Sequence, residues 1–201
     1  MVETARAIRT TSDLRRSEVL EAAAYLFATN GFHATGMREL ATRLQIKAGS
    51  LYHHTASKDQ LLNRVCEIGM EQLFLSLDRA IDPRQGFAAT IRAIMLGHAQ
   101  LLRNYGSFLR CYQNEYTNLS GEVSERMRGE LSGFHRRLEK VFEQAIASGE
   151  ARPGLDTRGA RQAIIALLFQ LSRLESSGSQ ADLDEIAIGM SDILVNGLAA
   201  R

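Results

Sequence analysis

TGMRELATRLQIKAGSLYHHTASK, residues 35–58, is the stretch of sequence that decides the fold of this chain. Apolar residues recur in it at three- and four-residue spacing, first at Met37, Leu40 and Leu44, after Thr35, a residue type that suits the N-cap of a short helix. A second pattern, only about two turns long, follows residues 45–48 and contains Leu51. Two short helices separated by a tight turn predict a helix-turn-helix.

The second of these helices has the composition of a recognition helix. Its outer side must be small and polar, because bulky side chains would keep its backbone out of the DNA major groove. Ala48, Gly49 and Ser50 meet this requirement, and we expect Leu51 to anchor the helix to the core. The side chains able to donate hydrogen bonds to phosphates or base edges are Lys47, Tyr52, His53 and Lys58. For Tyr52 the alternative is a half-buried packing role.

The rest of the chain predicts helices only. Apolar residues keep helical spacing on both sides of the quoted stretch, and the two prolines, Pro83 and Pro153, lie where the helical patterns break. We therefore expect an all-α protein of about nine helices. A three-helix DNA-binding domain with the helix-turn-helix would cover residues 1–56, and a helical effector-binding and dimerisation domain residues 57–201. Besides the two short helices, the predicted helices cover residues 13–29, 57–80, 85–103, 105–118, 121–148, 157–176 and 182–199.

Composition and charge restrict the class of protein. The chain is 45% hydrophobic and 23% charged, which fits one or two compact domains and not a disordered polymer. No window approaches the ~18 consecutive apolar residues of a membrane span, and the polar N-terminus lacks a secretory signal, so we expect a cytoplasmic protein without a membrane partner. Residues 1–64 carry nine basic and six acidic side chains, whereas the remainder carries fifteen and seventeen. A basic front favours a polyanion as its partner.

Neither catalytic nor metal-binding residues are predicted. Cys66 and Cys111 lie in apolar-periodic stretches outside any zinc-ligand spacing, and we interpret them as core residues, with redox sensing as the alternative. The side chains of His53 and His54 diverge, because adjacent residues on a helix point apart. The chain also lacks a glycine-rich phosphate loop and a nucleophile elbow. We therefore expect no enzyme and no cofactor.

Several phrases of the sequence resemble the tetracycline-repressor (TetR) family. They are TGMRELA at residues 35–41, Ile46 with GSLYHH at residues 49–54, and SKDQLL at residues 57–62, together with Phe27-Ala28, Asn30-Gly31-Phe32 and Ala34 ahead of them. The close match runs from about residue 18 to residue 62, close to a quarter of the chain. The resemblance implies a homodimer whose two recognition helices occupy successive major grooves of a pseudo-palindromic operator.

The resemblance also assigns roles by motif position. Thr35, Tyr52 and Lys58 would contact backbone phosphates, and Arg38 of the same motif belongs to the DNA-binding set. The residues implied to face the groove are Lys47, Ala48, Gly49, Ser50 and His53. Two positions depart from the family pattern: Gly36 replaces the common Ser, Thr or Val, and Thr55 replaces the usual Phe or Tyr. A slightly softer headpiece is expected from these departures.

The last two predicted helices are apolar over more than one face, which indicates a partner beyond the chain's own core. Two such helices from each subunit would form a four-helix dimer interface, as the resemblance also implies. The alternative is that they complete the core of the monomer. The predicted interface residues are Ile164, Leu168, Leu171, Ile186, Met190, Ile193 and Leu194.

Aromatic side chains with a few polar neighbours favour a cavity for an organic ligand around residues 101–116, with ordinary core as the alternative. The predicted lining residues are His98, Leu102, Tyr105, Phe108, Tyr112, Gln113, Glu115, Phe134 and Phe169. Residues 112–115 and 150–153 resemble family members that respond to lipid or steroid acyl-CoA thioesters. In that case Arg92, Arg103 or Arg110 would meet the phosphates of the ligand.

Together these patterns predict a dimeric repressor that leaves its operator when a small, largely apolar organic ligand binds. The long helix that starts with the capping box at Ser57 would act as the lever. The alternatives are a helical small-molecule enzyme and a protein-interaction adaptor without a DNA role. DNA binding discriminates between them, because phosphate contacts make affinity depend steeply on salt.

Overall fold

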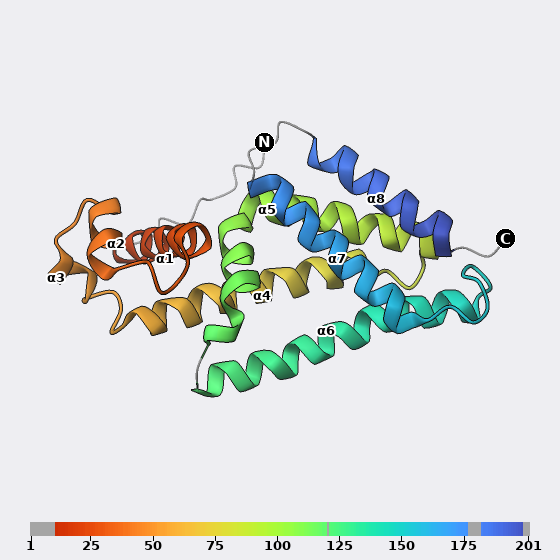
Figure 1. Cartoon of the computed structure of the whole chain (residues 1–201), viewed down its shortest axis with the longest axis horizontal. Helices are drawn as coiled ribbons and strands as arrows, with labels where there is room; N and C mark the ends of the chain where they lie inside the picture. The colour runs from red at the N-terminus through yellow and green to blue at the C-terminus, as the bar shows by residue number, and fades with distance from the viewer. Residues whose placement is uncertain (1–10, 120, 177–181, 199–201) are drawn as a thin grey trace, which may run out of the picture.

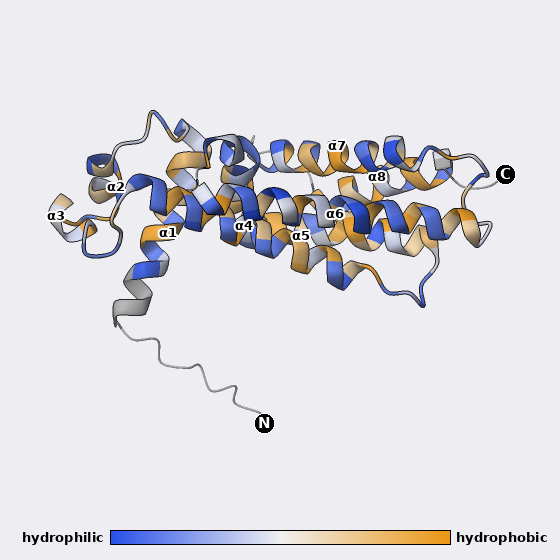
Figure 2. Cartoon of the chain, turned by 90° about the horizontal axis from the view of Figure 1, so that it is seen from below, coloured by the Kyte–Doolittle hydropathy of each residue, from blue (hydrophilic) through white to orange (hydrophobic). Residues whose placement is uncertain are grey.

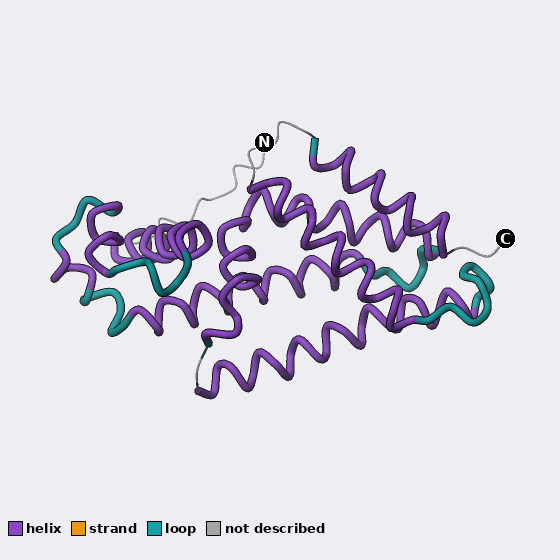
Figure 3. Tube along the Cα trace, in the orientation of Figure 1, coloured by secondary structure: helices purple, strands orange, loops and turns teal. Residues whose placement is uncertain are grey.

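The computed structural model describes residues 11–119, 121–176 and 182–198 (Figure 1). Every regular element in these ranges is a helix, and Figure 3 shows no strand in the part of the chain that it describes. The prediction of an all-α protein is therefore confirmed. Within the same ranges, no helix is both long enough and apolar enough to cross a membrane.

Eight α-helices and one short 3-10 helix follow one another along the described residues. They are α1 (Thr11–Asn30), α2 (Met37–Arg43), α3 (Ala48–Leu51), α4 (Lys58–Ala80), α5 (Phe87–Glu115), the 3-10 helix η1 (Tyr116–Asn118), α6 (Gly121–Ala147), α7 (Thr157–Ser176) and α8 (Leu183–Leu198). The helices α1 to α3 form a headpiece at one end of the molecule, and α4 runs from the headpiece into a body made of α5 to α8 (Figure 1).

The prediction of nine helices is corrected at α5. The elements expected at residues 85–103 and 105–118 form one helix with a kink, where only Tyr105 leaves helical geometry (φ −134°, ψ 21°). Because no proline removes a backbone donor there, helical hydrogen bonding resumes directly after the kink. In Figure 1 the later half of α5 turns steeply away from the earlier half.

The start of α4 follows from its predicted capping sequence. Ser57 is extended (φ −156°, ψ 166°), and its Oγ accepts a hydrogen bond from the Gln60 backbone N–H at 3.1 Å. Asp59 lies in the first turn, where the helix dipole favours negative charge. The buried face of α4 begins at once with Leu61 and Leu62, so the helix is fixed to the core from its first turn.

The centre of the body is the pair α4 and α5, which has the most extensive helix–helix contact among the described residues. A Cβ built on Gly69 would lie 2.5 Å from the carbonyl oxygen of Phe108, so only glycine fits at this crossing. Cys66 of α4 lies three residues before Gly69, and Cys111 of α5 lies three residues after Phe108. Both cysteines are fully buried. A hydrogen bond with Cys66, together with burial, raises the pKa of the Cys111 thiol. The burial of both side chains confirms their interpretation as core residues.

The remaining helices cover this central pair. α8 lies along α5, and two ion pairs join them, Arg92–Asp192 at 2.6 Å and Arg103–Asp184 at 2.9 Å. α7 contacts α5, α6 and α8. Figure 2 shows hydrophilic and apolar residues alternating along the body helices, the pattern expected of helices with one face on a core.

Alanine at Gly69 tests the close crossing of α4 and α5. We expect Gly69→Ala to lower the free energy of unfolding by about 1–3 kcal/mol, because the atom in the way is a backbone carbonyl and cannot rotate aside. The matched control is Gly129→Ala, at an exposed position of α6 with open space around a built Cβ. This change should raise stability by about 0.5–1 kcal/mol. Urea denaturation followed by circular dichroism measures both, and equal effects would contradict the close crossing.

Candidate DNA-binding surface and effector cavity

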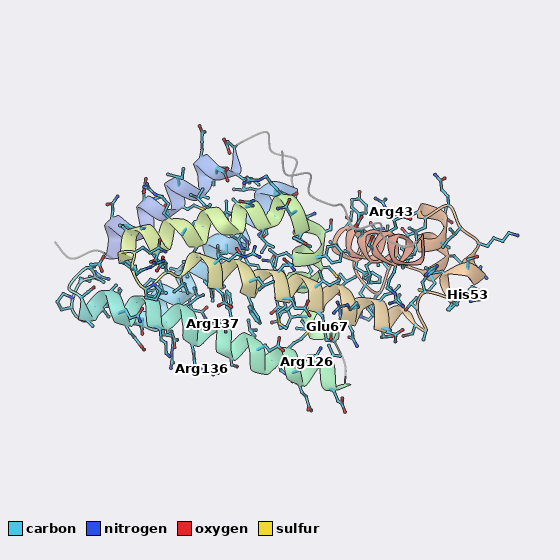
Figure 4. All side chains as sticks on the ribbon, turned by 180° about the vertical axis from the view of Figure 1, so that it is seen from behind. Arg43, His53, Glu67, Arg126, Arg136 and Arg137 are labelled. Carbon is cyan, nitrogen blue, oxygen red and sulfur yellow. The ribbon has the colours of Figure 1, made fainter. Side chains whose placement is uncertain are left out.

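The short helix α3 is held in place by a single buried side chain. Leu51 is fully buried, in the same apolar cluster as Phe27 of α1 and Leu40 of α2. The residues just before it are exposed, and so are Tyr52 and His53 after it. Figure 4 places His53 at the outer end of the headpiece. α3 therefore presents a small, polar edge to solvent on a packed support.

Most of the predicted DNA-binding residues share this exposed surface. They are Arg38, Lys47, Ala48, Gly49, Ser50, Tyr52 and His53. Tyr52 has 56% of its surface exposed, which speaks against the alternative that it packs half-buried. That these residues contact DNA stays a prediction.

Thr35 points into the protein, so its predicted roles as helix cap and phosphate contact are corrected. It is 2% exposed, and its hydroxyl donates a hydrogen bond to the Gly31 carbonyl at 2.9 Å. The N-cap of α2 is Gly36 instead, and its backbone N–H donates to the Glu39 carboxylate at 3.4 Å. The reason lies in the turn at Gly31 (φ 85°), which folds the chain back so that Thr35 faces α1.

Lys58 also binds the protein and does not extend toward solvent as a phosphate ligand would. Its Nζ donates hydrogen bonds to the carbonyls of Phe32 at 2.9 Å and Thr35 at 3.1 Å. The same nitrogen lies 4.2 Å from the centre of the Phe32 ring. In this structure Lys58 therefore ties the connection between α1 and α2 to the start of α4.

Glu115 holds the same connection from the other side. This carboxylate at the end of α5 is 7% exposed, and it accepts a hydrogen bond from the Phe32 backbone N–H at 3.0 Å. Its other oxygen accepts from the Asn118 side chain at 2.6 Å. The prediction that Glu115 lines the ligand cavity is wrong, because its acceptors are occupied by the headpiece and by η1. We call Phe32, Lys58 and Glu115 the Phe32 junction.

A cavity of about 220 Å³ lies among α4, α5, α6 and α7. It is lined by five of the residues that the sequence analysis proposed for a ligand: His98, Tyr112, Gln113, Phe134 and Phe169. A second cavity of about 220 Å³ shares Tyr112, Tyr116 and Leu131 with the first and reaches Arg128. Each is smaller than the roughly 300–1,000 Å³ of typical ligand sites, whereas the two joined fall within that range.

Leu102, Tyr105 and Phe108 do not line this cavity, contrary to prediction. They line a separate cleft of about 520 Å³ between α1, α2 and the kinked region of α5. This cleft lies beside the kink of α5, where Tyr105 leaves helical geometry.

Apart from Phe134, sequence reasoning missed the residues of η1 and α6 that line the cavities. Tyr116, Arg128, Leu131 and His135 all line one or both of them. Tyr116 could have been found from the sequence, because it follows Tyr112 by four residues and residues four apart share a helix face. Nothing in the local pattern of α6 shows which face meets α5.

His98 is the most buried polar residue of the cavity. It is 2% exposed, and its Nε2 lies 3.3 Å from Ser172 Oγ. Burial lowers the pKa of His98 to about 4, outweighing the opposite effect of a backbone contact at Leu168. The imidazole is therefore neutral near pH 7. Burial also lowers the pKa of His135, helped by Arg161.

Most of the predicted dimer residues lie in the chain's own core. Ile164 and Leu171 are fully buried, and Leu168 and Leu194 are 5% and 7% exposed. For these four, the prediction is corrected in favour of the monomer-core alternative, because the body already covers them. Ile186 and Met190 are half-buried, and Ile193 is 73% exposed. On α7 the exposed large apolar side chain is Phe169, at 44%.

The three arginines considered for ligand phosphates are each paired with a carboxylate of α7 or α8. The pairs are Arg92–Asp192, Arg103–Asp184 and Arg110–Glu175. None of the three lines the two cavities, whereas Arg103 and Arg110 line the separate cleft beside the kink of α5, so a phosphate role for these arginines stays a prediction. Arg128 lines the second cavity and forms no ion pair with the carboxylates of the described residues.

Two family models match this chain, one on each part. Residues 19–65 match the model of bacterial regulatory proteins of the tetR family, and residues 85–198 match a tetracyclin repressor-like C-terminal domain. The chain belongs to the tetR family. It is therefore a DNA-binding transcriptional regulator and not an enzyme, and the resemblance seen in the sequence is confirmed.

Relatives of this tetR-family protein match it over nearly its whole length. The HTH-type transcriptional repressor KstR2 of Rhodococcus jostii (strain RHA1) is 27% identical over 187 residues, 92% of each chain. The structure of the ketosteroid transcriptional regulator KstR2 of Mycobacterium tuberculosis has a TM-score of 0.86 at 24% identity, covering 93% of this chain and 96% of that one. AibR in complex with isovaleryl coenzyme A and operator DNA has a TM-score of 0.79 at 25% identity, covering 90% and 98%.

Lys47→Ala and Lys58→Ala are expected to act in different ways. Lys47 is exposed beside α3, so its loss should weaken binding to duplex DNA and reduce the slope of log K against log salt by about 1, with stability unchanged. Lys58→Ala removes two hydrogen bonds from the Phe32 junction and should lower the free energy of unfolding by about 1–3 kcal/mol. Fluorescence anisotropy in a salt series and thermal unfolding measure the two effects. If Lys58→Ala leaves stability unchanged and reduces the slope of log K against log salt, Lys58 contacts a DNA phosphate.

Proposed function

We propose that this tetR-family protein is a homodimeric repressor that binds a pseudo-palindromic operator and is released by a small, largely apolar organic ligand. The observation that carries the proposal is the exposed, small and polar edge of α3 on its buried Leu51 anchor, at the outer end of the headpiece. Residues 1–56 would form the DNA-binding unit and residues 57–201 the effector-binding and dimerisation unit. A repressor of this kind acts in the cytoplasm, where the bacterial chromosome lies.

The dimer interface would use the outer faces of α7 and α8. Ile193 of α8 is a large apolar side chain with 73% exposure, and Ile186 and Met190 of the same helix are covered only in part. Burial of such side chains against a second copy removes apolar surface from water, the usual driving force of association. A two-fold symmetric pair would present two α3 helices to one operator.

The effector would occupy the two adjoining cavities of the body. Their walls are mostly apolar and aromatic, with a few polar side chains such as Gln113 and His135, the composition expected of a site for an organic molecule. AibR, a structural relative, was solved with isovaleryl coenzyme A. An acyl-CoA thioester would fit this layout with its acyl part beside Phe134 and its charged part toward Arg128, a guanidinium suited to phosphate.

The Phe32 junction would transmit ligand binding to the headpiece. Tyr112 and Tyr116 line both cavities, and Glu115 lies between them in the sequence. A ligand that displaces the end of α5 would therefore displace Glu115, whose carboxylate holds Phe32. The headpiece would then change its orientation relative to a second copy, and the dimer would lose its fit to the operator. Loss of DNA affinity is the thermodynamic counterpart of ligand preferring that state.

Selection from a randomised duplex library by the purified full-length chain tests the operator. We expect enrichment of a two-fold symmetric site with half-sites about 10 base pairs apart, or a multiple of that spacing, and affinity that falls steeply with salt. Tyr52→Ala should weaken binding to the selected site and to unrelated DNA alike. Ile193→Asp should yield monomers in sedimentation and lose the symmetric site. Enrichment of no site, or binding insensitive to salt, would favour the adaptor alternative.

Amide exchange at Phe32 tests the junction. In Glu115→Leu the Phe32 N–H loses its acceptor, so we expect its hydrogen-exchange rate to rise at least about tenfold, which corresponds to about 1.4 kcal/mol. The matched control is Glu122→Leu, an exposed glutamate in the first turn of α6. NMR exchange on the full-length protein measures both variants. An unchanged exchange rate at Phe32 would show that Glu115 does not hold the headpiece.

A further inference from the structure

His98, which lines the first cavity, has one polar atom that no group of the described protein satisfies. This atom is Nδ1 of His98, which is buried and has no hydrogen-bond partner. The whole residue is only 2% exposed. The two other buried nitrogens in this condition belong to Arg137 and Arg161, and neither of those residues lines the cavity. The same lining contains the apolar side chains of Leu168 and Phe134.

The protonation of the His98 ring follows from a short chain of hydrogen bonds. Ser172 Oγ lies 3.2 Å from the Leu168 carbonyl, which can only accept, so the single hydroxyl proton of Ser172 is used there. Ser172 Oγ must then accept from His98, so Nε2 carries the ring proton at its 3.3 Å contact. A neutral imidazole has one proton only, and the low pKa of His98 keeps the ring neutral. Nδ1 is therefore a bare acceptor.

An acceptor in this position selects the chemistry of its ligand. A buried lone pair without a donor is a desolvated polar group, and a ligand N–H or O–H that reaches it returns the lost hydrogen bond. A ligand carbonyl or ether oxygen would instead bring a second lone pair against the first. The lining also contains Gln113 and Gln162, which are less buried, and each amide can both donate and accept, so neither discriminates.

We infer that the effector of this protein carries a hydrogen-bond donor, most simply a hydroxyl, within the apolar part that enters the body, and that His98 Nδ1 accepts from it. The inference rests on the proposed role of the cavity as the effector site. It narrows the ligand class: an acyl-CoA thioester would need a hydroxylated acyl group, because the thioester carbonyl is an acceptor and does not complement Nδ1. His98 is then the residue that separates hydroxylated ligands from their deoxy counterparts.

Three probes of nearly identical shape test this directly. Indole, benzofuran and indene differ at one ring position, which is an N–H donor, an oxygen acceptor or a methylene group. Each is titrated into the purified full-length protein without DNA, with binding measured by calorimetry. We expect indole to bind about 5- to 10-fold more tightly than indene, and benzofuran no more tightly than indene. Equal binding of indole and indene, or a preference for benzofuran, would overturn the inference while leaving the cavity a ligand site.

Two variants assign the preference to His98. Glutamine at position 98 keeps an N–H group able to reach Ser172 but has no acceptor at the position of Nδ1, so His98→Gln should bring the indole-to-indene ratio close to one. The control is His135→Gln, which changes a histidine of the same cavity and should leave the ratio unchanged. An unchanged ratio in His98→Gln would place the acceptor elsewhere. If none of the three probes binds the wild-type protein, the effector role of the cavity and the inference about His98 are both overturned. The DNA-binding role is tested separately, by the selection of an operator.

Discussion

The crossing of α4 and α5 is the constraint on which the rest of the structure depends. Gly69 lets the two helices approach until a backbone carbonyl occupies the space of a side chain. This contact sets the register of the hairpin, and the register brings the Cys66 and Cys111 thiols together and buries both. It also places the start of α4 and the end of α5 at the same end of the body, beside the headpiece. The helix that carries Lys58 and the helix that carries Glu115 therefore reach the same loop.

That loop is held by polar contacts and not by apolar burial alone. Phe32 accepts from Lys58 through its carbonyl and donates to Glu115 through its amide, while its ring packs edge-on against Phe27. Buried backbone groups need such partners, because an unpaired one costs about as much as a lost hydrogen bond. The contacts on the two sides come from different body helices. A relative shift of α4 and α5 would therefore strain the loop and change the headpiece that it carries.

Elsewhere in the body, charged side chains form ion pairs between helices, whereas one buried ring nitrogen has no partner among the described residues. Arg92, Arg103 and Arg110 are neutralised by carboxylates of α7 and α8, which fixes these helices against α5. The ion pair between Glu67 and Arg126, two residues labelled in Figure 4, ties α4 to α6 in the same way. The His98 ring, in contrast, is satisfied at one nitrogen only. The ion pairs of Arg92 and Arg103 lie about half exposed at the surface, whereas the open nitrogen of His98 is buried.

The sequence by itself determined the features that depend on neighbours along the chain. Helical spacing of apolar residues, the capping sequence at Ser57 and the small residues before Leu51 were enough for an all-α chain with a helix-turn-helix and an exposed recognition edge. The tertiary structure alone decided the direction of Thr35, Lys58 and Glu115, the kink of α5 at Tyr105, and the burial of Ile164 and Leu171. The reason is physical: these outcomes depend on contacts between residues far apart in sequence, such as Phe32 and Glu115 at a separation of 83. A periodic pattern shows that a face is buried, but it does not show which helix buries it.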